Sequence, residues 1–179
     1  MGNKPLKHRG GMVGHFIQDG LARGLKFGFI GGSDSHGLIW HHGVAYKRNC
    51  YRTGLTAILA PELTRDALFQ ALRQRNCYAT SGIKLFLRVE LEDSIPGDTI
   101  QLDHAPKFVI ECISPEHLDY ITIVRNNIDY YHYGGEGFRS LIRFEDSKPL
   151  IGDSYYYIRV VTRGGNMAWS SPIWVTMSG

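Results

Sequence analysis

The chain has 179 residues, of which 43% are hydrophobic and 21% charged, and this is ordinary for a globular protein with a core of its own. Its formal net charge is only +3 and its basic residues are scattered, which argues against nucleic acid or an acidic membrane as a partner. No apolar run approaches the ~18 residues of a membrane-spanning helix. No apolar segment follows the polar N-terminal residues, so we expect no signal peptide.

The cysteines Cys50, Cys77 and Cys112 form no Cys-x-x-Cys pair, and their odd number does not suggest a disulfide framework. We expect reduced thiols that are for the most part buried. Reduced cysteines and the absence of a signal peptide favour a cytoplasmic location.

The first part of the chain has the pattern of alternating helices and strands. Apolar residues at helical spacing predict a helix over residues 12–23, and two short apolar runs, 26–30 and 55–59, are typical of buried strands. Thr64 is a good N-cap, so a second helix is expected to begin there. The order helix, strand, loop, strand, helix predicts α/β structure for residues 1–82.

After Lys84 the pattern changes to an alternation of apolar and charged residues, with the period of two that is typical of half-buried strands. Further strand-like runs follow at a spacing of about 8–12 residues, with turn residues between them. Residues 83–179 are therefore predicted to form an antiparallel β-sandwich, Ig-like in architecture but without the cysteine pair of antibody domains. Its many aromatic residues could form a sugar-stacking face, although such residues more often build a core or cross-strand pairs. The fold class expected for the whole chain is α+β, in two domains.

A polar, glycine-rich stretch follows the first apolar run and has the sequence Gly31-Gly32-Ser33-Asp34-Ser35-His36-Gly37. Because Asp34 and His36 are two residues apart, their side chains point to the same side of an extended segment. A carboxylate and an imidazole so placed can share a divalent cation or bind two neighbouring ones. The alternative is a structural turn, in which the glycines adopt unusual backbone angles and His36 is an ordinary surface residue.

The loop that follows this stretch carries further polar side chains. His41 or His42 could add a third ligand to a zinc site, which needs three or four. The alternative is that both are exposed loop residues. Arg48 or Arg52 could neutralise an anionic substrate, although most loop arginines are simply solvated.

The order of the motifs resembles that of one known family. After the Gly-Ser-Asp-Ser-His turn come Tyr78-Ala79-Thr80-Ser81-Gly82 and, near the C-terminus, Trp169-Ser170-Ser171-Pro172-Ile173-Trp174. From about Gly20 to Val175 the sequence resembles the C-terminal part of metal-dependent hydrolases of the PHP (polymerase and histidinol phosphatase) superfamily. The closest resemblance is to the branch in which a β-sandwich follows the barrel.

The resemblance implies a partial PHP-type (βα) barrel segment for residues 1–82, with Asp34 and His36 as ligands of a divalent metal, Zn, Mn or Fe. The chain departs from the family before this segment. It contains no His-x-His motif, and the few residues that precede Met12 leave the middle ligands of the family without a counterpart. Two βα units cannot close a barrel. We therefore expect a partner, either an N-terminal barrel-completing chain or further copies in a homo-oligomer.

Two functions are compatible with these observations. The first is a fragment or subunit of a metal-dependent hydrolase, in which a metal-activated water attacks the substrate. Among such hydrolases we favour a phosphoesterase that acts on a small phosphoester. The second is a non-catalytic β-sandwich that binds a partner or holds an assembly together, with a vestigial PHP segment. The sequence assigns no catalytic or substrate-binding residue beyond the two metal ligands.

Overall fold

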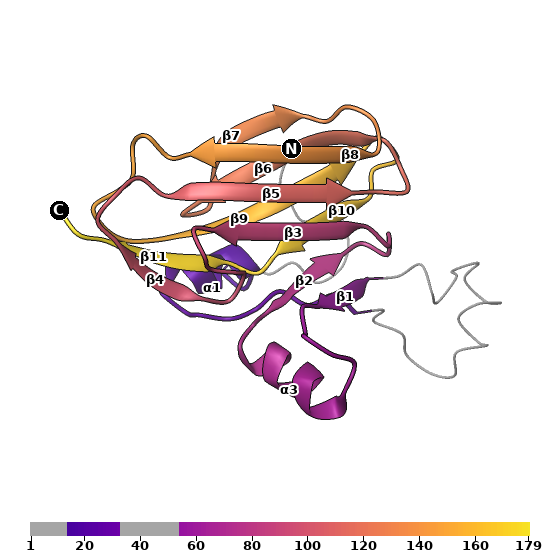
Figure 1. Ribbon diagram of the computed structural model, residues 1–179, viewed down its shortest axis with the longest axis horizontal. Helices are drawn as coiled ribbons and strands as arrows, with labels where there is room; N and C mark the ends of the chain where they lie inside the picture. The colour runs from indigo at the N-terminus through magenta and orange to yellow at the C-terminus, as the bar shows by residue number, and fades with distance from the viewer. Residues whose placement is uncertain (1–13, 33–53) are drawn as a thin grey trace.

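The computed structural model describes residues 14–32 and 54–179, which form a β-rich body with two short helices (Figure 1). The helices are α1 (Ile17–Ala22) and α3 (Arg65–Arg73). The strands, in chain order, are β1 (Leu55–Ile58), β2 (Cys77–Thr80), β3 (Phe86–Leu91), β4 (Thr99–Leu102), β5 (Lys107–Ile113), β6 (Leu118–Arg125), β7 (Ile128–Gly134), β8 (Arg139–Glu145), β9 (Gly152–Thr162), β10 (Met167–Ser170) and β11 (Ile173–Met177).

The strands form two sheets that face each other. The smaller sheet has the order β3-β5-β8, and both of its pairings are antiparallel. In the larger sheet the long strand β9 is central, with β6 and then β7 on one side and both β10 and β11 on the other. β2 and β1 extend this sheet beyond β10, and β4 extends it beyond β11 as a parallel neighbour.

The main core lies between the two sheets. Alternate residues of β3, β5, β6 and β9 point into it and are almost fully buried. In β3, Leu87 and Val89 are at most 3% exposed, whereas Phe86, which precedes them on the strand, is 47% exposed. The alternation expected after Lys84 is thus confirmed by the burial pattern of this strand.

The N-terminal segment 14–32 covers the other face of the larger sheet. Leu21 of α1 and Phe29 pack there with Tyr157 and Trp174, in a second cluster of buried residues. The rings of Phe29 and Tyr157 meet edge to face, with their centroids 5.3 Å apart. This packing fixes the segment that leads toward the Asp34 motif.

Both predicted helices are present. α1 covers the middle of the helix expected over residues 12–23, and Gly24 beyond its end takes a φ of 79°, which suits a helix terminus. α3 begins as expected, because the Thr64 hydroxyl accepts a hydrogen bond from the amide of Ala67 at 3.3 Å.

The expected α+β class and the partial PHP-type barrel segment are wrong. Neighbouring strands of a (βα) barrel are parallel, but β1 and β2 pair antiparallel, with Leu55 opposite Thr80 and Ile58 opposite Cys77. α3 lies in the connection between these two strands. Residues 26–30, expected to be a strand, lie outside the regular strands. The described chain is therefore mostly β and forms largely a β-sandwich-like fold.

The division of the chain into parts 1–82 and 83–179 stays a prediction. The larger sheet runs across it, because β2 pairs with β10 from Thr80 opposite Ala168 to Tyr78 opposite Ser170. The sandwich also departs from a purely antiparallel one at the parallel pair of β4 and β11.

Cys77 and Cys112 are buried free thiols, which confirms the expectation for these two cysteines. Cys50 lies outside the described residues. In the same part of the chain, neither helix has the length and apolar character needed to span a bilayer.

Candidate functional site

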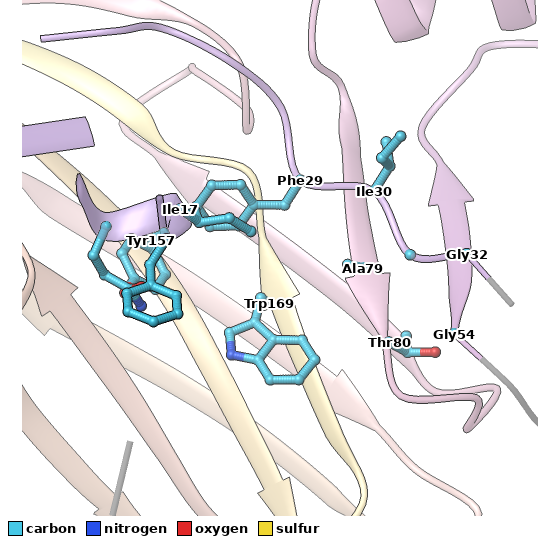
Figure 2. A pocket seen from close by; sticks show the side chains of 12 residues that line it. Ile17, Phe29, Ile30, Gly32, Gly54, Ala79, Thr80, Tyr157 and Trp169 are labelled. Atoms are coloured by element: carbon cyan, nitrogen blue, oxygen red, sulfur yellow. The ribbon is translucent and has the colours of Figure 1, made fainter. Parts of the chain in front are cut away.

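A pocket of about 380 Å³ lies on the outer face of the larger sheet, beside the start of α1 (Figure 2). The start of α1 and the extended residues 29–32 form its walls, and residues of β2, β9 and β10 form its floor. The lining residues are Phe16, Ile17, Gln18, Phe29, Ile30, Gly31, Gly32, Gly54, Ala79, Thr80, Tyr157 and Trp169.

The register of the sheet sets the floor of the pocket. Thr56, Ala79 and Trp169 stand opposite one another across β1, β2 and β10, and the row continues to Arg159 on β9. Cross-strand neighbours point to the same face of a sheet, and so do residues two apart on one strand. Tyr157 therefore shares this face with Arg159, and its ring closes the pocket beside Trp169.

Hydrogen bonds hold the extended wall against the sheet. The hydroxyl of Thr56 donates to the carbonyl oxygen of Gly31 at 2.8 Å and accepts from the Gly31 amide at 3.0 Å. The amide of Phe29 donates to the Ser171 hydroxyl at 2.9 Å. Gly31 lies so close to β1 that a Cβ there would meet a backbone oxygen at 2.5 Å, so the close approach requires glycine.

The pocket is lined mainly by apolar and aromatic groups. Phe29, Tyr157 and Trp169 contribute rings, whereas Gln18 and Thr80 contribute polar side chains. None of its lining residues is an aspartate, glutamate, histidine or cysteine. A pocket of this size and character can bind a small organic group, and among its described lining residues only Tyr157 and Thr80 carry a hydroxyl that could take part in chemistry.

The predicted metal ligands and the loop residues considered with them lie outside the described residues: Asp34, His36, His41, His42, Arg48 and Arg52. The two described residues that flank this stretch of sequence, Gly32 and Gly54, both line the pocket. They are also close together, since a Cβ on Gly54 would lie 2.7 Å from the carbonyl oxygen of Gly32. The chain therefore leaves and re-enters the described structure at the pocket.

Within residues 14–32 and 54–179, no group of three or more His, Cys, Asp or Glu side chains is arranged to hold a metal ion. The described residues by themselves therefore provide no site for the metal that the family resemblance implies.

A buried polar cluster around Asp146 was missed by the sequence analysis. This residue is 0% exposed, and its carboxylate accepts hydrogen bonds from the hydroxyls of Tyr130 and Tyr156 and from Arg125, each at 2.7 Å. Burial alone would raise the pKa of Asp146, but the hydrogen bonds outweigh this effect and hold the pKa below its ordinary value. The partners come from β7, β9 and β6, so this cluster ties strands of the larger sheet to the end of β8.

Arg159 was missed as well, although it is fully buried on the outer face of the larger sheet. One of its terminal nitrogens, Nη2, donates to Asp129 at 2.6 Å. Its Nε and Nη1 groups have no hydrogen-bond partner in the part of the chain that the structure describes. A single charged residue inside the apolar run 155–161 is the signal that could have revealed this ion pair, because a buried charge requires a partner.

Comparisons with known proteins identify similar proteins, but the descriptions of these proteins name no activity. Residues 39–106, less than half of the chain, match the family model described as "Protein of unknown function (DUF3604)". Relatives occur in Chlamydia trachomatis serovar D, with 28% identity over 179 residues, and in Chlamydia muridarum, with 27% over 179 residues. A protein of Chlamydia pneumoniae is 31% identical over 181 residues.

Each of these three relatives is described as an uncharacterized protein, and each matches 90% of this chain. The chain, however, spans only 29% of the length of each relative. A search of the solved structures finds no significant match.

Proposed function

We propose that this chain is a fragment or subunit of a metal-dependent hydrolase that acts on a small phosphoester. In this proposal Asp34 and His36 bind the divalent metal, Zn, Mn or Fe, together with ligands from beyond the described residues. The bound metal would supply an activated water. The pocket beside α1 binds the organic group of the substrate.

One observation carries the proposal. Gly32 and Gly54, which flank the stretch that contains the Asp-x-His motif, both line the pocket. A ligand in the pocket would therefore lie close to where the chain enters this stretch. The apolar and aromatic lining suits the organic part of an ester better than its phosphate, which needs cationic or amide donors.

The two free thiols Cys77 and Cys112 support a cytoplasmic location, which is part of this proposal.

The metal content of the purified chain, measured by elemental mass spectrometry after incubation with Zn or Mn, tests the metal assignment. We expect about one tightly bound ion per chain, lost in Asp34→Ala and in His36→Ala. The matched controls are Asp103→Ala and His104→Ala, because these residues form an exposed carboxylate–imidazole pair, 2.9 Å apart, in the sandwich. Equal metal content in all variants, or no metal in the wild type, would contradict the proposal.

The alternative function is a non-catalytic binding or assembly module. One observation favours it: Phe69 and Leu72 of α3 are 56% and 41% exposed. The two functions are separable, because partner binding through α3 should persist in Asp34→Ala and in the presence of a chelator, whereas hydrolysis should not.

A further inference from the structure

A second pocket, of about 370 Å³, lies beside the end of α1. Residues at the end of this helix, in the turn between β6 and β7, at the start of β9 and in β11 line it. It shares none of its described lining residues with the pocket beside the start of α1. We call it the turn pocket, because Asn126 and Asn127 of the β6–β7 turn are among its lining residues.

Two opposite charges line the turn pocket without pairing with each other. Lys26 and Asp153 are both exposed lining residues. The Lys26 ammonium group donates to the Thr99 hydroxyl at 3.3 Å, and the Asp153 carboxylate accepts from the Thr176 hydroxyl at 2.7 Å. Among the described residues, no ion pair joins Lys26 or Asp153 to any charged side chain. The pocket thus offers a cation and an anion to a bound molecule.

The β6–β7 turn adds a buried acceptor to these charges. The side-chain amide of Asn127 is oriented by its Nδ2 group, which donates to the carbonyl oxygen of Gln18 at 2.8 Å. Its Oδ1 atom is buried and accepts no hydrogen bond from the part of the chain that the structure describes. A buried acceptor without a donor is destabilising. The turn pocket therefore favours a ligand that brings a hydrogen-bond donor to Asn127.

The remaining lining is largely apolar or aromatic and includes Leu21, Ala22 and Tyr155. Trp174 also lines the pocket but is only 7% exposed, and the cationic groups of Lys26 and Arg75 lie 5.7 and 5.5 Å from its ring centroid. A sugar ring needs an open aromatic face on which to stack, and Trp174 does not offer one. This argues against a carbohydrate and leaves room for an apolar side chain.

Ligands with a single charge suit the turn pocket less well. Lys26 would repel a simple cation, whereas Asp153 would repel a simple anion, which would also leave Asn127 without a donor. A zwitterion satisfies all of these groups. We propose that the turn pocket binds a free α-amino acid with an apolar side chain, its ammonium group on Asp153 and Asn127 and its carboxylate on Lys26. This inference does not depend on the proposed hydrolase activity.

NMR titration of the full chain with L-leucine tests the proposal. Isopentylamine lacks the carboxylate of leucine and isocaproate lacks its ammonium group, so each keeps the side chain and only one of the charges. We expect leucine to shift the amide signals of Asn126 and Asn127. It should bind about tenfold more tightly than either analogue, since each analogue loses a charge-assisted hydrogen bond.

Charge-removing variants assign the two ends of the ligand. Lys26→Met should weaken leucine binding about tenfold without weakening the binding of isopentylamine, which has no carboxylate. Asp153→Asn should weaken leucine binding by a similar factor without weakening that of isocaproate. The matched controls Lys107→Met and Asp119→Asn change exposed charges outside the turn pocket and should leave leucine binding unchanged.

The same titrations can overturn the proposal. No saturable binding of leucine, or equal affinity for leucine and either analogue, would contradict recognition of a zwitterion. Amide shifts confined to residues outside the turn pocket would place the leucine site elsewhere. Glucose that binds as tightly as leucine would show that the pocket takes a neutral polyhydroxy ligand instead.

Discussion

The hydroxyl of Thr56 is hydrogen-bonded to both backbone groups of Gly31, donating to its carbonyl oxygen at 2.8 Å and accepting from its amide at 3.0 Å. In a regular sheet, the backbone of a neighbouring strand would make these hydrogen bonds. Here the side chain of Thr56 on β1 makes them and holds the extended wall of the pocket. This arrangement holds the residues that lead into the Asp34 motif.

Thr56→Val keeps the shape of the side chain but leaves both backbone groups of Gly31 without this partner. We expect a loss of about 1–3 kcal/mol in the free energy of unfolding, since partly buried polar groups lose their hydrogen bonds. Urea denaturation measures it. Thr56→Ser, which keeps the hydroxyl, is the control and should lose less than half as much; equal losses would show that the methyl group, not the hydroxyl, matters.

Much of the β-structure could be predicted because the residue pattern of a strand is visible in a short window of sequence. Leu87 and Val89 alternate with exposed residues, and this period is visible in any window of the sequence. Strand direction is different, because it depends on which strand is the neighbour. The apolar run at Leu55 looks the same in a parallel barrel and in the antiparallel pair with Thr80, so it could not expose the error in the barrel segment that the family resemblance implied.

The polar cluster could not be predicted for a related reason. Asp146 is separated along the sequence from Tyr156, Tyr130 and Arg125 by 10, 16 and 21 residues. Only the packing of four strands brings these groups together, and their spacing along the sequence does not predict this contact. For the candidate site, the alternative of a turn with unusual glycine angles is not borne out at Gly31 and Gly32, which are not among the glycines with a positive φ. The aromatic floor of the pocket depends on the register of β9 and β10, which the sequence does not reveal.

Asp146 should make stability depend on pH. Because its pKa is lower in the folded chain than in the unfolded one, its ionised form stabilises the fold at neutral pH, and this contribution is lost as pH falls through the folded pKa. Asp146→Asn should therefore lower stability at pH 7 and flatten the dependence below about pH 4, the range of an ordinary aspartate.

Urea denaturation at a series of pH values compares this variant with Asp119→Asn, which changes an exposed aspartate of β6. The control should keep the wild-type profile. If the free energy of unfolding of Asp146→Asn still falls steeply at acid pH, other carboxylates cause this dependence.

Cys112 should be inert toward thiol reagents in the folded chain. Its side chain is 0% exposed, and burial raises the pKa of its thiol to about 12, so almost no thiolate forms at pH 8. In a Cys50→Ser background, Ellman's reagent should modify the remaining thiols at least 100-fold more slowly than in urea. Rapid modification of the folded chain would show that the structure opens around Cys77 in β2 or around Cys112 in β5.

The pocket makes a prediction that does not require catalysis. Ile17 lines the pocket and is 49% exposed, so Ile17→Ala removes apolar contact from a ligand without opening the core. We expect about 1 kcal/mol weaker binding of p-nitrophenyl phosphate, roughly a fivefold rise in Kd, since about 0.8 kcal/mol is gained for each buried methylene. Binding of methyl phosphate, which lacks the aromatic ring, should change less than twofold. NMR titration gives both constants, with Ile128→Ala, outside the pocket, as the control. An equal rise for both ligands would mean that the ring binds elsewhere, and the pocket would lose its assigned role as the recess for the organic group.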